Sequence, residues 1–252
     1  LVKLNERMSL DGEPVSDERL YSVWTEIEPI LGLVDEELAA SGEEPLTFFE
    51  ALAVLGFSIF ADAPVDVLVL EVGMGGEWDA TNVADADVAV FTAIDLDHQK
   101  SLGDTVEEIA ATKAGIIKEN SLVVSSPQYP GVIEVLEGRT ANLKLSGRDF
   151  EYGDVMADGF GTRFSVRGLA TDYPQVWMPI IGFHQAQNAA TAIAAVELYN
   201  LAKDDLFSFL ENSSHRKRLS NLELDRDIKY CLTLNQCPVL PILDGKFLIK
   251  GV

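Results

Sequence analysis

The chain has 252 residues, of which 47% are hydrophobic and 8% aromatic, and this length and composition suit a globular protein with a sizeable core. Its formal net charge of -22 argues against binding to nucleic acid or to an anionic membrane surface. No run approaches the roughly 18 to 20 apolar residues of a membrane span, and the first residues lack the apolar segment of a secretory signal. The two cysteines, Cys231 and Cys237, have neither metal-site spacing nor a disulfide pattern, so we expect a cytoplasmic protein.

The first third of the chain is expected to hold two helical segments and a strand. Residues 16–38 carry helical spacing with a serine as N-cap, and Pro29 and Gly32 are expected to divide this helix into two pieces. Residues 47–61 are strongly apolar and too long for a typical strand, which predicts a buried helix. Residues 66–72 contain four consecutive apolar residues, which predicts a strand buried on both faces, as in a parallel sheet.

A carboxylate and three glycines follow this predicted strand. Glu71 stands at its end, before Gly73, Gly75 and Gly76. In open α/β sheets the ligand lies outside the carboxyl ends of the strands, and a carboxylate there can hold a hard cation such as Mg2+. From this segment alone, an ordinary strand–loop junction with a solvated glutamate is an equally good interpretation.

The rest of the chain alternates strands and helices. Strands are predicted over residues 87–92 and 121–125, with a helix over 105–114 between them. Helices between buried strands imply a mostly parallel sheet flanked by helices, so the predicted fold class is α/β. Residues 149–176 are polar and punctuated by glycine, which predicts short antiparallel strands at the edge of the sheet, and the Ala-rich residues 185–201 predict a closely packed helix.

Two further residues could contribute to a metal site. His98 follows the strand that ends near Thr92, so it and Glu71 are expected at one edge of the sheet. Lys113 lies in the next helix, and a desolvated lysine loses its proton more easily, so its amine could take up CO2 and become an anionic carbamate ligand. From spacing alone, a solvent-facing Lys113 paired with a glutamate is the better interpretation, and a lone loop histidine is more often a hydrogen-bonding residue.

Several ordered motifs resemble one known family, the folylpolyglutamate synthase/dihydrofolate synthase family of the Mur ligase superfamily. The resemblance runs from Leu1 to about Leu198. The motifs are T-F-F-E at 47–50, V-D-V-L-V-L-E-V-G-M-G-G-E-W-D-A-T-N-V at 65–83, L-D-H at 96–98, L-G-D-T-V-E-E-I-A at 102–110, K-A-G-I-I-K at 113–118 and H-Q-A-Q-N-A-A at 184–190.

The resemblance implies a Mur ligase central domain of the P-loop NTPase-like type over residues 1–202. It makes residues 203–252 an unassigned remnant or a degenerate start of a C-terminal domain. The implied reaction is ATP-dependent addition of L-glutamate to a folate or dihydropteroate carboxylate through an acyl phosphate, with ATP and Mg2+ as cofactors. A monomer is the expected state.

The resemblance also implies roles for single residues. It makes Glu71 a ligand of one Mg2+, and it makes His98 and a carbamylated Lys113 the ligands of a second. The implied contact with the nucleotide is Asn188. The implied contacts with the pterin side of the substrate are Thr47, Phe49, Asp79 and Ala80.

The sequence departs from the family pattern at both ends. The phosphate-binding loop G-x-x-G-K-[ST] would lie upstream of Leu1, and only Leu243-Asp244-Gly245 resembles the L-D-G-A-H-N motif of the C-terminal domain. Glu77 also stands where the family usually has arginine. We therefore expect a domain truncated at both ends that has little or no ligase activity by itself.

Two other interpretations stay open at this stage. The L-E-V-G-M-G-G segment also suits an S-adenosylmethionine-dependent methyltransferase, although K-A-G-I-I-K then has no explanation; a dinucleotide-binding dehydrogenase is weaker, because the glycine spacing fails at Trp78. A non-catalytic fragment of a pseudogene would show exposed apolar surface.

Overall fold

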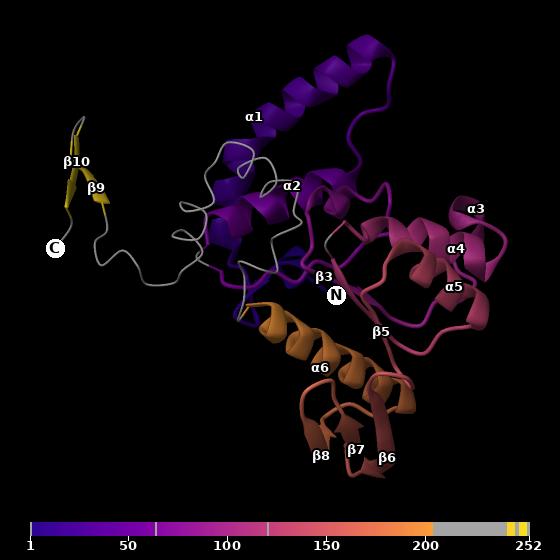
Figure 1. Cartoon of the computed structure of the whole chain (residues 1–252). Coiled ribbons are helices and arrows are strands. Elements are labelled where there is room, and N and C mark those ends of the chain that lie inside the picture. Colours follow the sequence, from indigo (N-terminus) through magenta and orange to yellow (C-terminus); the bar gives the residue numbers. More distant parts are fainter. Residues whose placement is uncertain (1, 64, 120, 204–240, 245–246, 251–252) are drawn as a thin grey trace, which may run out of the picture. The chain divides into compact units, whose positions relative to one another are not determined.

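The computed structural model describes residues 2–63, 65–119, 121–203, 241–244 and 247–250 (Figure 1). The chain divides into two units, Leu1–Ala84 and Asp85–Val252. Each unit has buried apolar clusters of its own, and each is described by itself.

The first unit is built on two helices, α1 (Asp17–Ser41) and α2 (Phe48–Ala61). Before them come the 3-10 turn η1 (Leu4–Arg7) and a short hairpin of β1 (Ser9–Leu10) and β2 (Glu13–Pro14), and the turn η2 (Ala80–Val83) follows them. The core of the unit consists of Met8, Val15, Val23, Ile27, Leu31, Leu55 and Ile59.

Helix α1 begins where the sequence predicts but does not break where expected. The Ser16 side chain accepts a hydrogen bond from the Arg19 amide at 3.2 Å, so the predicted N-cap is confirmed. The predicted division at Pro29 and Gly32 is wrong, because one helix continues through both residues to Ser41.

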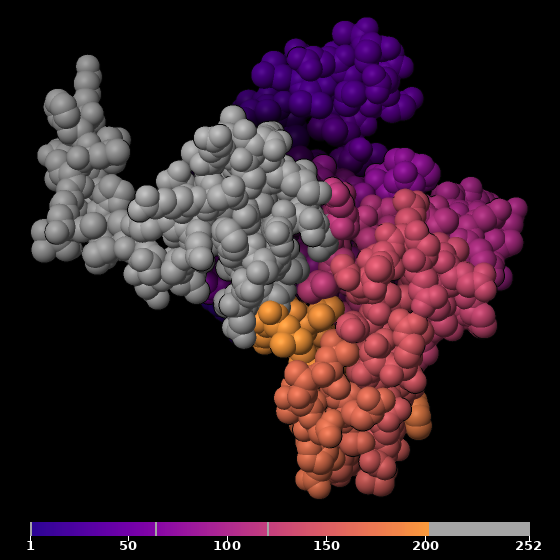
Figure 2. All heavy atoms as spheres, in the orientation of Figure 1, coloured from indigo at the N-terminus to yellow at the C-terminus, as the bar shows by residue number. Residues whose placement is uncertain are grey.

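The physical reason is the buried stripe of α1. Val23, Ile27 and Leu31 are spaced four residues apart, so they lie on one face of the helix and are buried on both sides of Pro29. This packing offsets the hydrogen bond that proline cannot donate. Helix α1 extends past α2 in the ribbon (Figure 1), and indigo atoms of the first unit project at the top of the space-filling view (Figure 2).

The predicted strand over residues 66–72 is wrong. None of the sheets in the described part of the chain includes this segment, and Val67 and Val69 are 54% and 87% exposed. A strand exists only through hydrogen bonds to a neighbouring strand, and an apolar run makes a segment suitable for a sheet without supplying that neighbour. Among the described residues of the first unit, the only sheet is the β1–β2 hairpin.

The second unit begins with a parallel sheet in the order β3-β4-β5. The strands are β3 (Val88–Phe91), β4 (Leu122–Ser125) and β5 (Leu143–Leu145), joined through the helices α3 (Gln99–Leu102), α4 (Val106–Lys113) and α5 (Pro130–Arg139), with the turn η3 (Ala114–Ile116) after α4. The predicted strands and the predicted helix over 105–114 are therefore confirmed, and so is the α/β fold class. The sequence analysis did not predict α3, α5 or β5.

An antiparallel sheet and a long helix complete the described part of this unit. The strands β6 (Glu151–Asp158), β7 (Gly161–Arg167) and β8 (Asp172–Met178) form a three-stranded sheet of their own. Helix α6 (Phe183–Lys203) confirms the predicted Ala-rich helix and packs against both sheets, with Ala186, Ala190 and Ala194 fully buried. Small side chains let the helix approach the strands closely.

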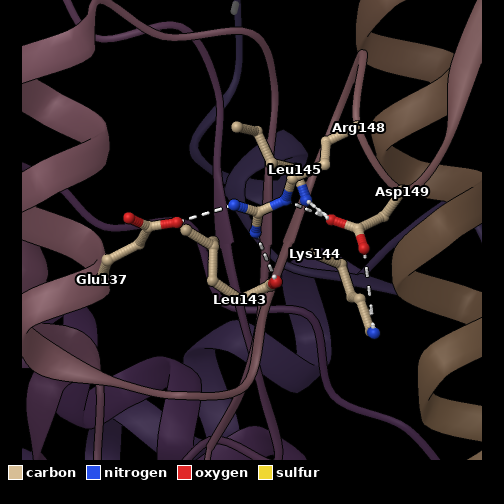
Figure 3. Close-up of polar contacts among 6 residues, drawn as sticks. All are labelled: Glu137, Leu143, Lys144, Leu145, Arg148 and Asp149. Atoms are coloured by element: carbon tan, nitrogen blue, oxygen red, sulfur yellow. Dashed lines mark hydrogen bonds and ion pairs between the residues drawn. The ribbon is translucent and has the colours of Figure 1, made fainter.

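Arg148 fixes the corner between β5 and β6 (Figure 3). Its guanidinium donates to Glu137 at the end of α5 (2.6 Å), to Asp149 (3.0 Å) and to the carbonyl of Leu143 (3.1 Å). These bonds, first the one to Glu137, hold the pKa of Arg148 above its usual range. Partial burial would raise the pKa of Asp149, but its bonds from the Leu145 amide and from Arg148 hold that pKa below its usual value.

The C-terminal region is described only in part. Strands β9 (Pro241–Asp244) and β10 (Phe247–Lys250) pair as an antiparallel hairpin. The interpretation of residues 203–252 as a remnant domain falls mostly outside the described residues. Of the helices that the structure describes, none is both long and apolar enough to cross a membrane.

Candidate functional site

The glycine-rich loop of the first unit is closed by Asp79. One carboxylate oxygen accepts from the Met74 amide at 2.9 Å, and the other accepts from the amide and the hydroxyl of Thr81 at 3.0 and 2.5 Å. Asp79 is also the N-cap of η2, in which Ala80 is the first residue. A carboxylate has about four lone-pair sites, so Asp79 can hold the loop and still accept from a ligand.

Phe49 packs directly on this loop. A Cβ atom added to Gly73 would lie 2.7 and 2.8 Å from two ring carbons of Phe49, closer than real Cβ contacts come. Gly75, in the same loop, has a φ of 73°, which favours glycine. The structure therefore brings Phe49, Asp79 and Ala80 to one region of the first unit, although it forms no strand before the loop.

Thr47 begins the helix that carries Phe49. Its hydroxyl accepts from the Glu50 amide at 3.2 Å and lies 2.7 Å from a Glu50 carboxylate oxygen, which in turn accepts from the Thr47 amide. This is a capping box, which satisfies backbone donors that the first turn of a helix leaves unpaired. Thr47 therefore has a structural role besides its predicted one.

Glu71 is an exposed carboxylate in the same unit. Within the part of the chain that the structure describes, it accepts no hydrogen bond and forms no ion pair, so its oxygens are free for a ligand. The expected geometry at a strand end is not present, because the segment before Glu71 is not a strand.

His98 has a left-handed backbone in the second unit. Its φ is 49° and its ψ is 35°, a conformation that is uncommon outside glycine but that histidine, like asparagine and aspartate, adopts more often than other residues. The amide of His98 donates to Asp97 at 2.8 Å, and its carbonyl accepts from the amides of Ser101 and Leu102, the last two residues of α3. The imidazole is 57% exposed, with Nε2 3.6 Å from the Asp97 carboxylate. Strained backbone of this kind gathers at functional sites.

Lys113 is the last residue of α4 and is half-buried. The structure gives it no ion pair with any described residue, so the interpretation as a solvent-facing lysine paired with a glutamate is wrong.

The metal ligands that the sequence predicts are divided between the units. Glu71 lies in the first unit, whereas His98 and Lys113 lie in the second. Over the described residues, no group of three or more His, Cys, Asp and Glu side chains could hold a metal. Of the three residues, Glu71 supplies an anionic oxygen of the kind that Mg2+ takes from proteins, and Lys113 would supply another only as a carbamate.

Asn188 lies in the second turn of α6. Its side chain is exposed and has no hydrogen bond to another described residue. Near the start of the helix, a Cβ atom on Gly182 would lie 2.6 Å from the His184 ring, and Gly182 has a φ of 141°. The Asn188 side chain, the predicted contact with the nucleotide, is therefore exposed on α6 and free to bond a ligand.

The sequence analysis missed Gln128, which follows β4. Its side-chain amide bonds to backbone groups of Thr92 and Ile94, four to six residues before His98. Only pairing across the sheet brings these residues together, so no local pattern in the sequence indicates the contact.

The family model of the Mur ligase middle domain matches residues 18–196. The chain thus belongs to the Mur ligase middle-domain family. A second model, described as 2-phosphosulpholactate phosphatase, matches residues 177–246, which are less than half of the chain.

Within this family the chain is similar to folylpolyglutamate synthases. It is 41% identical over 208 residues to the dihydrofolate synthase/folylpolyglutamate synthase of Mycobacterium tuberculosis, covering 77% of this chain and 42% of that protein. A solved structure of the M. tuberculosis folylpolyglutamate synthase complexed with ADP has a TM-score of 0.71 at 38% identity, covering 76% of this chain and 44% of that one. A folylpolyglutamate synthase–AMPPCP–folate complex has a TM-score of 0.75 at 32% identity, covering 80% and 50%.

The chain spans less than half the length of the curated relatives it matches first, 42% and 47%. These comparisons give the methyltransferase interpretation no support.

Proposed function

We propose that this chain is the central-domain part of an ATP-dependent ligase that joins L-glutamate to the carboxylate of a folate or a dihydropteroate. The reaction would activate that carboxylate as an acyl phosphate, which the glutamate amine then captures. The similarity to folylpolyglutamate synthases solved with ADP, and with AMPPCP and folate, supports this class of reaction.

The observation that carries the proposal is the pair of His98 and Lys113. One is held in a strained backbone conformation, and the other is a half-buried lysine without a counter-charge among the described residues. Both residues stand at positions that match the family's metal-site motifs.

The residues have separate tasks under this proposal. Glu71 would hold one Mg2+, and His98 with a carbamylated Lys113 would hold a second. The Mg2+ ions, when bound, neutralise the repulsion between the substrate carboxylate and the triphosphate. Asn188 would contact the nucleotide. Residues 1–202 would form the central ATPase domain, and the protein would be a cytoplasmic monomer.

The first unit would bind the pterin. Phe49 offers an aromatic face that a flat heterocycle can stack on, and Asp79 can accept hydrogen bonds from the ring N–H and amino groups. Thr47 and Ala80 would line the same region. Glu77, an exposed acid in this loop, would repel the glutamate tail of the substrate.

The decisive measurement separates metal binding from turnover. The whole chain is incubated with 13C-labelled CO2, and the carbamate carbon is observed by NMR in the wild type, in Lys113→Ala and in Lys100→Ala. Lys100 is an exposed lysine and serves as the control. We expect a carbamate signal in the wild type and in Lys100→Ala that is lost in Lys113→Ala.

Glutamate incorporation into dihydropteroate and into a reduced folate is then assayed with ATP and Mg2+. We expect little or no turnover by the chain alone, so the readout that tests the metal ligands is ADP binding, which should fall about tenfold in Lys113→Ala and His98→Ala relative to the wild type. The absence of both a carbamate at Lys113 and ADP binding by the wild-type chain would contradict the proposal.

A further inference from the structure

A chain of polar side chains crosses the carboxyl end of the parallel sheet. It begins at Gln128, whose side-chain nitrogen donates to the Thr92 carbonyl at 2.8 Å and whose oxygen accepts from the Ile94 amide at 2.9 Å. The regular pairing of β3 with β4 ends at Phe91 and Ser125. Beyond the last paired residues of β3 and β4, the Gln128 side chain therefore supplies the hydrogen bonds to the backbone that leads from β3 into the His98 loop.

The same nitrogen of Gln128 connects to the next strand. It donates to the Ser125 hydroxyl at 3.0 Å, and that hydroxyl donates to the carbonyl of Ser126 at 3.0 Å. Ser125 and Ser126 are fully buried. Each polar group in this turn thus has a partner inside the protein, and removing one partner leaves another unsatisfied away from water.

The chain continues into α6. The hydroxyls of Ser126 and Thr191 lie 2.8 Å apart, and Thr191, only 1% exposed, also donates to the Gln187 carbonyl at 3.0 Å. Because that donation uses the Thr191 proton, the Ser126 hydroxyl donates to Thr191. Gln187 directly precedes Asn188 in the sequence, so the chain ends beside the residue predicted to contact the nucleotide.

We propose that Gln128, Ser125, Ser126 and Thr191, here called the carboxyl-end network, are positioning residues that fix the His98 loop relative to the Asn188 turn of α6. This inference rests on the proposed function, because it assumes that His98 binds a metal ion and Asn188 the nucleotide. The network would then keep these two residues at a fixed distance and orientation. None of its members needs to touch a ligand. Their effect is to prevent the loop and the helix from moving independently, and networks of satisfied buried hydrogen bonds hold their members rigidly.

Two pairs of variants of the whole chain test the network. Gln128→Ala removes the contacts to Thr92 and Ile94, and Gln175→Ala makes the same change at an exposed residue of β8. Thr191→Val removes the hydroxyl at nearly constant shape, and Thr191→Ser keeps it. In all four variants we would measure amide hydrogen exchange at Ile94 by NMR, Mn2+ affinity by electron paramagnetic resonance, and ADP affinity by calorimetry.

We expect Gln128→Ala to weaken Mn2+ binding about tenfold and to raise the exchange rate of the Ile94 amide by a similar factor. Thr191→Val should weaken ADP binding several-fold, and Thr191→Ser should restore it to nearly the wild-type value. A merely structural role would lower stability in Gln128→Ala without changing ligand affinity in the protein that stays folded.

The outcomes distinguish this inference from the proposed function. A wild-type chain that binds neither Mn2+ nor ADP contradicts the proposed function and the network's task with it. A wild type that binds both, with Gln128→Ala and Thr191→Val binding equally well, overturns the network alone.

Discussion

Thr47 has a structural role that would coexist with its proposed contact with the substrate. Its hydroxyl and amide both bond to Glu50 in the capping box of α2. These bonds, first the side-chain bond and then the backbone bond, lower the pKa of Glu50. A substrate group that bonds to the Thr47 hydroxyl must therefore compete with the cap or share it.

The capping box leads us to predict how the free energy of unfolding depends on pH. A lowered pKa means that folding favours the ionised carboxylate, so this stabilisation is present above the ordinary pKa of 4.5 and is lost as the pH falls through the lowered value in the folded state. Glu50→Gln keeps the shape of the side chain but cannot ionise. Because Glu50 is exposed, we expect a loss of only about 0.5 kcal/mol at neutral pH.

Urea unfolding of the wild type and Glu50→Gln across the acid range measures this effect. The two curves should differ at neutral pH and converge in acid, whereas Glu44→Gln, a change at an exposed glutamate without this cap, should follow the wild type throughout. A difference between Glu50→Gln and the wild type that grows in acid would contradict the prediction.

At the scale of elements, the sequence predicts what local signals determine. The N-cap Ser16, the apolar run of α2 and the Ala-rich α6 are read from neighbouring residues, and the structure confirms each of them. The strand over 66–72 failed because strand formation depends on a distant partner, and the break at Pro29 failed because tertiary packing outweighed the local signal.

In the candidate site, too, the sequence predicts only part of what the structure shows. The metal-binding roles proposed for His98 and Lys113 rest on motifs, whereas no spacing rule predicts the left-handed backbone of His98 or the half-burial of Lys113. Gln128 could not be found from the sequence, because the two backbone groups that it bonds, of Thr92 and Ile94, lie more than thirty residues earlier in the chain. A motif identifies candidate residues, whereas the tertiary structure determines which other residues they contact.

Glu197 ties α6 to the turn between β7 and β8. It is 7% exposed and accepts from the amides of Leu169, Ala170 and Thr171 at 2.6 to 3.2 Å, and from the Tyr173 hydroxyl at 3.1 Å. Four donors converge on one buried carboxylate. The helix that carries Asn188 is thereby attached to the antiparallel sheet as well as to the parallel one.

Glu197→Gln should destabilise the second unit by about 2 kcal/mol, because an amide nitrogen replaces a charged acceptor oxygen and leaves backbone N–H groups of the turn without their partner. Urea unfolding followed by circular dichroism measures the loss. Glu134→Gln, an exposed glutamate of α5, is the matched control and should change the stability little. An equal effect of the two substitutions would show that Glu197 does not act as an anchor.

For the whole molecule, charge is the dominant feature. The sequence has 41 acidic residues against 19 lysines and arginines, so the folded chain repels itself and also repels a triphosphate or a folate tail. Binding such ligands therefore needs cations, and stability should depend strongly on the ions present.

Raising NaCl from about 10 to about 100 mM shortens the Debye length from about 30 to about 10 Å. We expect the screening to stabilise the chain by about 1 kcal/mol, or about 2 to 4 °C in unfolding temperature. Calorimetry with MgCl2 at equal ionic strength should show a further increase, because an ion bound only by the folded state adds stability. Equal unfolding temperatures in the two salts would argue against specific Mg2+ sites.

The backbone of His98 has a consequence for evolution. Glycine has no Cβ and would enter this left-handed conformation at lower cost, so neutral drift should carry the position away from histidine if the imidazole had no function. Mutation repeatedly produces substitutions that would lower the conformational energy of this loop. A histidine that persists there indicates selection on the side chain itself, acting against the preference of the fold.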